Sequence, residues 1–312
     1  RGEHLNIHTI ESFIPSYYVD NVARALQFGV QDQALATKIG PRKLPVLDAA
    51  LEPSDMVVQS VEKACKSAAF DTRSLQALVV VTQNGDGAET IPHVSAIAHG
   101  KLGLGTDVLA FDVGLGCSGY VYGLVILSGL MKQMGIQRAA LVTADPYSRI
   151  INPEDRSTSL LFGDAATTTI LDPTGKWQVG HAILQTDGSK REHIKTVART
   201  FEMNGRQVFS FAATQVPEQI RQLLTEVSLT EQDIDQYCIH QGSGAIVRAI
   251  AAKFPAVSDR FPCEMAETGN TVSSSIPLLL QHRLNDERLR KVVLSGFGIG
   301  LSWGSMLIER VG

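Results

Sequence analysis

The stretch VLAFDVGLG at residues 108–116, followed by CSGYVYGLVILSGLMKQMG at residues 117–135, predicts a strand that passes directly into a helix. The first segment is apolar and ends in glycines, which let the backbone turn sharply. The second segment runs apolar at helical spacing and closes on Gly135. Cys117 therefore stands at a strand-to-helix turn, where small neighbours leave its thiol uncrowded.

Cys117 is a candidate nucleophile. A thiol at a helix N-terminus faces the positive end of the helix dipole and free backbone N–H groups, which lowers its pKa. The same N–H groups can hold the oxyanion that forms when a nucleophile attacks a carbonyl group. The alternative is a buried cysteine that acts as a small hydrophobic residue.

The bulk composition is that of a globular protein without unusual charge. Because the net charge of the 312 residues is −4, the overall field does not favour nucleic-acid binding. We find no signal peptide and no uninterrupted apolar stretch of membrane-spanning length. The cysteines at 65, 117, 238 and 263 form no CxxC pair and no metal-like spacing with histidine, which indicates a reducing cytoplasm rather than a disulfide framework.

An internal repeat decides the architecture. A predicted helix at 54–70 and strand at 75–84 recur as a helix at 216–229 and a strand at 234–243, with an offset of 159 residues between the strands. Further elements recur in the same order: helices at 92–102 and 244–254, and strand pairs at 138–148 with 164–172 and at 291–298 with 301–311. Alternating strands and helices predict an α/β fold, and two related halves predict a layered α/β/α/β/α arrangement.

The turn DPTGK at 172–176 suggests a boundary between the halves, at 1–172 and 173–312. Residues 186–206 are charged and weakly periodic, so we expect an excursion from the core. Residues 21–52 are irregular and are expected to cover a site entrance.

Polar residues gather at the predicted strand ends. His240 ends an apolar strand, and Asn270 precedes an apolar helix. A lone histidine there is more often structural, and an asparagine is a common cap or turn residue. The glycine-rich stretch GFGIGLSWGS at 296–305 reads alone as a tight hairpin. Together with Cys117, however, His240 and Asn270 at equivalent edges of a duplicated sheet would meet in one pocket.

These strings resemble the thiolase superfamily, and within it the β-ketoacyl-acyl-carrier-protein synthase III family. The family motifs occur in order over almost the whole chain: DVGLGCSG at 112–119, FGD at 162–164, HQ at 240–241, GNTVSSSIP at 269–277 and GFGIGLSWGS at 296–305. The resemblance implies a thiolase-like duplicated fold with two mixed sheets, with Cys117 in the first half and His240 and Asn270 in the second.

The resemblance also implies a mechanism. An acyl group passes from a thioester to Cys117, with the backbone N–H groups of Cys117 and Ile299 as the oxyanion hole. His240 and Asn270 then stabilise the enolate formed by decarboxylation of a malonyl-type thioester, which condenses with the acyl group to a β-ketoacyl product. No metal or redox cofactor is implied. The pathway expected is fatty-acid or secondary-metabolite biosynthesis.

The expected partners are acyl carrier protein, coenzyme A thioesters and a second copy of the chain, whose loop around Ile91 would close the acyl tunnel; a heterodimer is an alternative. Where the family carries a tryptophan and an arginine for the coenzyme A nucleotide, this chain has Ala34 and Lys38. That departure favours delivery by a carrier protein, or a partner subunit that completes the entrance. A basic docking face is expected at Arg248 and Lys253, with further cations at Lys190, Arg191 and Lys195, although an ordinary solvated face explains them almost as well.

Two other functions remain open at this point. The chain could be an acyltransferase that passes the acyl group from Cys117 to an alcohol or amine, in which case the decarboxylating asparagine should be lost. It could instead be a non-catalytic subunit of a heterodimeric synthase, which should have lost the cysteine or histidine. All three residues are present.

Overall fold

The computed structural model describes residues 5–312. Its strands are β1 Asn6–Phe13, β2 Tyr18–Asp20, β3 Lys43–Pro45, β4 Ala77–Val81, β5 Leu109–Val113, β6 Ala139–Ala144, β7 Ala166–Asp172, β8 Trp177–Thr186, β9 Ile194–Val197, β10 Thr200–Met203, β11 Gln236–Ile239, β12 Lys291–Gly298 and β13 Ser302–Arg310. Its α-helices are α1 Asn21–Gln27, α2 Asp32–Ala34, α3 Pro53–Ser67, α4 Val94–Lys101, α5 Gly119–Met134, α6 Arg156–Ser159, α7 Gly205–Glu226, α8 Gly244–Ala251 and α9 Ser275–Gln281. No helix in this part of the chain has the length and apolar character to span a membrane.

Within residues 5–312, nine strands form one mixed sheet in the order β11-β12-β13-β8-β1-β7-β6-β4-β5. The two predicted sheets are the two halves of this sheet, because β1 pairs with β8. That junction is short: it consists of Asn6 opposite Gln178 and Ile7 opposite Trp177. The expected mixed sheets are therefore present, but they are continuous at one edge.

Strand pairing confirms the duplication. In the first half, β1 runs antiparallel to β7, β7 antiparallel to β6, and β6 parallel to β4. In the second half, β8, β13, β12 and β11 follow one another with the same relative directions. The first half adds β5 beyond β4, whereas the sheet ends at β11 in the described second half. β7 ends at Asp172 and β8 begins at Trp177; the division of the chain at 172 stays a prediction.

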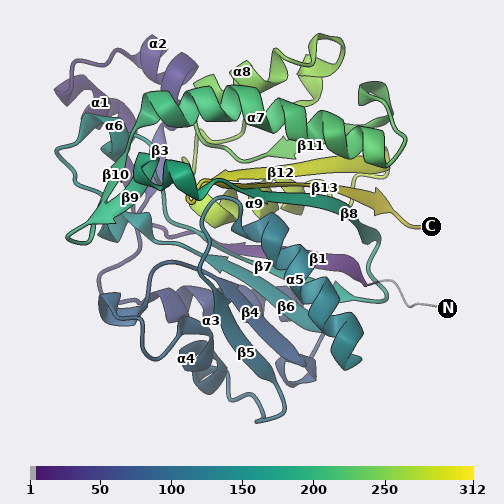
Figure 1. Ribbon diagram of the computed structural model, residues 1–312. Coiled ribbons are helices and arrows are strands. Elements are labelled where there is room, and N and C mark those ends of the chain that lie inside the picture. The colour runs from purple at the N-terminus through teal and green to yellow at the C-terminus, as the bar shows by residue number, and fades with distance from the viewer. Residues whose placement is uncertain (1–4) are drawn as a thin grey trace.

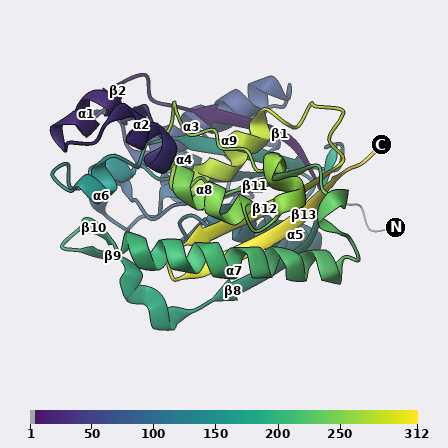
Figure 2. The ribbon, with the colours of Figure 1, turned by 90° about the horizontal axis from the view of Figure 1, so that it is seen from above.

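Five layers follow from the way the helices cover the sheet. Helices α3 and α4 pack on the outer face of the first half, and α7 packs on the second half with α8 beside it (Figures 1 and 2). Helices α5 and α9 lie between the two groups of strands and contact both. Leu124 and Leu127 of α5 and Ile276 of α9 are buried in this central layer, which explains why α5 is so apolar.

The turn quoted first in the sequence forms as predicted. β5 ends at Val113 and α5 begins at Gly119, so that Cys117 lies between them. Gly135 ends α5 with a φ of 68°, a left-handed conformation that glycine adopts without a steric penalty from a Cβ.

Three features differ from the expectation. β1 and β8 were not predicted. Helix α7 begins at Gly205 rather than at 216, and Pro217 lies inside it. Its first part buries Val208, Phe211 and Ala212 at helical spacing against the second half of the sheet.

The excursion predicted at residues 186–206 is confirmed, and it contains a small hairpin, β9–β10, outside the large sheet.

Candidate active site

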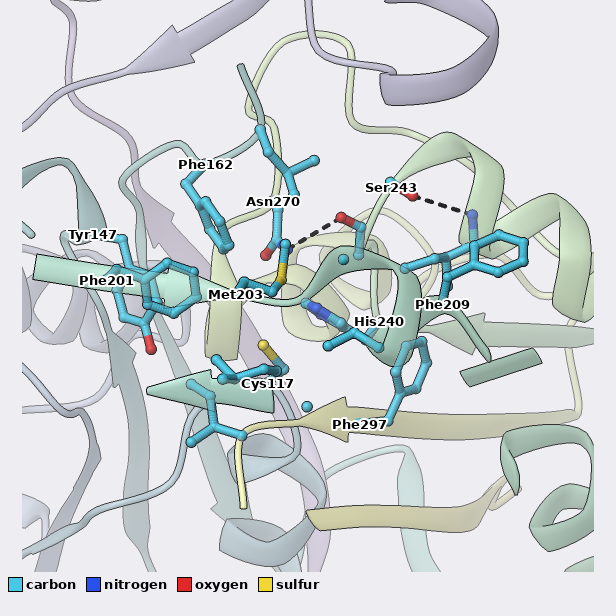
Figure 3. A pocket seen from close by; sticks show the side chains of 18 residues that line it. Cys117, Tyr147, Phe162, Phe201, Met203, Phe209, His240, Ser243, Asn270 and Phe297 are labelled. Carbon is cyan, nitrogen blue, oxygen red and sulfur yellow. Dashed lines mark hydrogen bonds between the residues drawn. The ribbon is translucent and has the colours of Figure 1, made fainter. Parts of the chain in front are cut away.

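Cys117, His240 and Asn270 line one cavity (Figure 3). Cys117 follows β5, His240 follows β11 and Asn270 precedes α9, so the two halves of the fold each supply part of the site. The other walls are largely apolar and are formed by Tyr147, Leu161, Phe162, Ile194, Phe201, Met203, Gly205, Val208, Phe209, Gly242, Ser243, Ile246, Phe297, Gly298 and Ile299.

The cavity has an open and a closed end. Phe209, at the start of α7, is 39% exposed and marks the mouth, together with Ser243 at the N-cap of α8. Tyr147 and Phe201, at the other end, are 2% and 4% exposed. Cys117 lies between these two ends in Figure 3. A substrate that enters past Phe209 therefore meets the thiol before it meets Tyr147.

The pKa expected for Cys117 is wrong. Its side chain is only 7% exposed. Burial, and secondarily the Asp145 carboxylate, raises the thiol pKa well above its ordinary value of 9.0. The cost of desolvating a thiolate thus outweighs the favourable helix terminus. In the free protein, Cys117 rests as a thiol.

The glycine-rich bend after β12 packs directly against this thiol. A Cβ added to Gly298 would lie 2.9 Å from Cys117 Cβ and 3.0 Å from its Sγ. A Cβ added to Gly116 would similarly lie 2.6 Å from Cδ1 of Ile299. The backbone segments that carry the N–H groups of Cys117 and Ile299 are therefore neighbours. Their role as an oxyanion hole stays a prediction.

His240 is held as a neutral donor. Its Nδ1 lies 2.7 Å from Oγ of Ser275, and that oxygen also accepts the backbone N–H of Gln241 at 3.2 Å. In the tautomer with the ring proton on Nε2, which we assign here, the Ser275 hydroxyl donates to Nδ1. Burial lowers the pKa of His240 to about 3. The ring is therefore uncharged at neutral pH and has one N–H to offer.

Asn270 is oriented in the same way by its own neighbours. Its Oδ1 accepts the backbone N–H of Val272 at 2.9 Å, and its Nδ2 donates to the carbonyl of Gly242 at 3.2 Å. An amide nitrogen has two protons, so one remains for a substrate. Because the side chain is 4% exposed and held at both ends, this donor is fixed before any substrate arrives.

Asp145, which the sequence did not single out, lies buried after β6 and beside Cys117. Its carboxylate accepts from the backbone N–H of Gln83 at 2.9 Å, from Asn84 Nδ2 at 3.0 Å and from Ser273 Oγ at 2.6 Å. Burial raises the pKa of Asp145 to about 6, against the opposing effect of these donors. A signal was present in the sequence, since Asp145 is a carboxylate within the apolar segment predicted as a strand at 138–148.

The four predicted binding residues do not line the cavity. Lys38 is exposed on the turn at Leu35–Ile39, which packs against α8 near the mouth. Arg248 is exposed on α8, and Lys253 is exposed just beyond its end. Ile91 is 87% exposed, and so a role at a tunnel would require a second chain. Binding by these residues stays a prediction.

The remaining cysteines differ from Cys117 in their surroundings. Cys65 and Cys238 are buried in the core, whereas Cys263 is exposed in a loop. Among the described residues, no group of three or more His, Cys, Asp or Glu side chains is placed to hold a metal ion.

Comparison with known proteins gives consistent matches. Residues 111–188 match the family 3-oxoacyl-[acyl-carrier-protein (ACP)] synthase III, and residues 224–310 match its C-terminal domain. The chain is 32% identical to a β-ketoacyl-[acyl-carrier-protein] synthase III of Pseudomonas aeruginosa, over 96% of this chain and 94% of that protein. It is 32% identical to β-ketoacyl-[acyl-carrier-protein] synthase III 3 of Streptomyces coelicolor, over 94% of this chain and 93% of that protein. The crystal structure of the synthase III from P. aeruginosa PAO1 superposes with a TM-score of 0.90 at 30% identity, covering 99% of each chain.

The raised pKa of Cys117 predicts how it reacts with iodoacetamide. Because only the thiolate reacts, alkylation of Cys117 in the free protein should accelerate with rising pH up to and beyond 9.0. Asp145→Asn removes a negative charge that raises this pKa, so it should increase the rate at a given pH. Peptide-resolved mass spectrometry would follow Cys117 with exposed Cys263 as an internal reference. A plateau of the Cys117 rate at neutral pH would contradict the structure.

The contact between Gly298 and the thiol predicts a second effect. Gly298→Ala should slow alkylation of Cys117 and lower the free energy of unfolding by about 1–3 kcal/mol, since the added methyl overpacks a filled space. Gly129→Ala is the matched control, because a Cβ there meets nothing within 4 Å and alanine is the better helix former. Denaturant unfolding and the alkylation rate would be measured for both variants. Equal behaviour of the two would show that the contact is unimportant.

Proposed function

The chain belongs to the β-ketoacyl-[acyl-carrier-protein] synthase III family, and we propose that it catalyses decarboxylative condensation of an acyl thioester with a malonyl-type thioester. The observation that carries the proposal is the cavity in which a cysteine thiol lies beside two neutral donors, His240 and Asn270, each fixed by hydrogen bonds to its neighbours. A nucleophile accounts for acyl transfer, and two aligned neutral donors suit an enolate oxygen.

In the first step, the Cys117 sulfur attacks the carbonyl carbon of the acyl thioester. The C–S bond between the acyl carbon and the sulfur of the donor breaks, and the departing donor thiol takes the Cys117 proton. The acyl group is then a thioester of Cys117, and it extends into the apolar part of the cavity. The N–H groups of Cys117 and Ile299 are the donors proposed for the oxyanion of this step.

In the second step, a malonyl-type thioester places its thioester oxygen against Nε2–H of His240 and the free Nδ2–H of Asn270. The C–C bond to the carboxylate breaks, carbon dioxide leaves, and the electron pair forms an enolate whose oxygen these donors stabilise. The enolate carbon attacks the acyl carbonyl. The bond between the acyl carbon and the Cys117 sulfur breaks, and the sulfur takes up a proton from solvent, in keeping with its raised pKa. The β-ketoacyl thioester then departs.

For the donor, we propose a pantetheine thioester on a carrier protein, with Lys38, Arg248 and Lys253 as contacts near the mouth. The cations of the excursion are less suited, since Lys190 pairs with Asp187 and Lys195 with Glu192. The acyltransferase alternative leaves Asn270 and its aligned proton without a purpose. The non-catalytic-subunit alternative likewise does not explain an intact cysteine, histidine and asparagine in one cavity.

The function is tested by intact-mass measurement after incubation with acetyl thioesters of pantetheine, coenzyme A and acyl carrier protein. The wild type should gain one acetyl group on Cys117, Cys117→Ala should gain none, and Cys263→Ala should behave as the wild type. Malonyl-carrier protein should then remove the acetyl group and yield a β-ketoacyl thioester and carbon dioxide. Carrier-dependent rates that fall with added salt would support the docking contacts. Transfer of acetyl to an alcohol or amine, without carbon dioxide release, would favour the acyltransferase.

Asn270→Asp predicts a separation of the two steps. An aspartate can still accept the Val272 N–H, but it has no proton for the enolate and faces the Gly242 carbonyl. Malonyl decarboxylation should fall by ~10²–10³, the cost of losing one such donor, while acetylation of Cys117 changes little. The control is Asn204→Asp, which makes the same chemical change at the N-cap of α7, where either side chain can cap. Equal loss in both steps would contradict the assigned role.

A further inference from the structure

The FGD stretch at residues 162–164, between α6 and β7 of the first half, lies against the segment that carries Asn270 in the second half. The backbone N–H of Asn270 donates to the carbonyl of Leu161 at 2.8 Å, and the backbone N–H of Gly163 donates to the carbonyl of Asn270 at 3.0 Å. The two bonds make an isolated parallel bridge between the segments. The main chain of Asn270 is therefore held by the half of the fold that supplies the nucleophile.

Two glycines permit this close approach of the backbones. A Cβ added to Gly163 would lie 2.0 Å from the backbone oxygen of Thr268 and 2.9 Å from Cδ of Pro45. From the other side, a Cβ added to Gly269 would lie 2.7 Å from the backbone oxygen of Leu161. Because ordinary van der Waals contact begins at 3.4 Å, no side chain fits between the segments at either position.

Asp164 ties the same stretch to the rest of the first half. Its buried carboxylate accepts the backbone N–H of Leu47 at 2.8 Å, and it also accepts the backbone N–H and the hydroxyl of Ser148. The backbone N–H of Asp164 donates to the carbonyl of Pro45 at 2.8 Å. A displacement of the stretch would leave these buried polar groups unpaired. Residues 162–164 are therefore a firm support for the segment that they contact.

The direction in which Asn270 offers its proton depends on this support. The side-chain bonds of Asn270 to Val272 and Gly242 set the rotation of its amide, and both partners belong to the second half. The bridge to the first half sets where the Asn270 main chain lies relative to Cys117, and Phe162 lies beside Asn270 on the same wall of the cavity (Figure 3). A donor misplaced by about 1 Å can cost on the order of 10²-fold in rate.

We propose that Gly163 is a positioning residue for the enolate donor Asn270, because it lets the first half hold the Asn270 main chain in backbone contact. The inference rests on the proposed function, which assigns Asn270 to the enolate. Gly163 then acts on the decarboxylation step and not on acyl transfer, since Cys117 is carried by the separate turn between β5 and α5.

Gly163→Ala tests the contact. The added methyl group should push the Asn270 segment away, so that carbon dioxide release from malonyl-pantetheine falls by ~10²-fold. Acetylation of Cys117 by acetyl-pantetheine, followed by intact mass, should change little. The matched control is Gly180→Ala in β8, where a Cβ would lie 2.6 Å from the backbone oxygen of Leu307 and outside the cavity. This control should also lower the free energy of unfolding, yet keep the ratio of the two rates.

A double-mutant cycle separates positioning from a general loss of packing. Asn270→Asp already lacks the donor proton, so adding Gly163→Ala should lower carbon dioxide release little further, because residues that act together are not additive. Asp164→Asn is a milder variant in case the alanine variant does not fold. Its amide replaces one of the two acceptor oxygens, and it should lower carbon dioxide release relative to acetylation.

The outcomes distinguish this role from the proposed function. An unchanged ratio of the two rates in Gly163→Ala, or in Asp164→Asn if the alanine variant does not fold, overturns the positioning role alone. So does an equal fall of the ratio in Gly180→Ala, or a loss that multiplies fully with that of Asn270→Asp. A wild type that neither becomes acetylated on Cys117 nor releases carbon dioxide from malonyl-pantetheine overturns the proposed function and the positioning role together.

Discussion

The buried carboxylate of Asp145 holds together the segments that build the cavity. It accepts hydrogen bonds from the residues after β4 and from Ser273, which follows Asn270 in the other half of the fold. A buried carboxylate is costly unless donors surround it, so these segments are constrained to converge on it. Through Gln83, the same carboxylate also sets the position of the Tyr147 ring. The wall of the cavity and the donor Asn270 therefore share one support.

This support influences the nucleophile. A negative charge and a dry surrounding both favour the neutral thiol, and so Cys117 is stored in a form that reacts slowly with adventitious electrophiles. The two hydrogen-bond donors differ from Cys117, because their protons are available to a substrate in the resting site. His240 is uncharged because of burial, and Asn270 cannot titrate, so both present their protons at any pH near neutrality. The resting site is thus ready to stabilise an enolate while its nucleophile remains protonated.

Much of the fold could be predicted because its signals are local. The turn at Cys117 follows from glycines between an apolar strand and an apolar helix, and the duplication follows from repeated patterns at constant offset. β1 and β8 pair with β7 and β13 of their own halves and only briefly with each other, and no local pattern of residues specifies such strand partners. The start of α7 was hidden by the charged excursion that precedes it.

In the site, too, local features could be predicted from the sequence and features that depend on the whole fold could not. Cys117, His240 and Asn270 could be found from strand ends and motifs, but the thiol pKa could not, since a helix dipole is a local property and burial depends on the whole fold. Tyr147 and Asp145 lie within the segment predicted as a strand at 138–148, yet nothing in that segment says what they contact. Lys38, Ile91, Arg248 and Lys253 were named by analogy, and the single chain leaves them outside the cavity.

Among residues 5–312, β5 has no counterpart in the second half, and this asymmetry accompanies a division of tasks between the halves. In the first half, the chain passes through β5 before it reaches Cys117 and α5; in the second half, the segment before α9 makes an isolated bridge between Asn270 and Phe162 of the other half. The two copies have thus specialised in different tasks, one supplying the nucleophile and the other the donors. The proposed reaction therefore needs both halves, since each half supplies only some of the residues that take part in it.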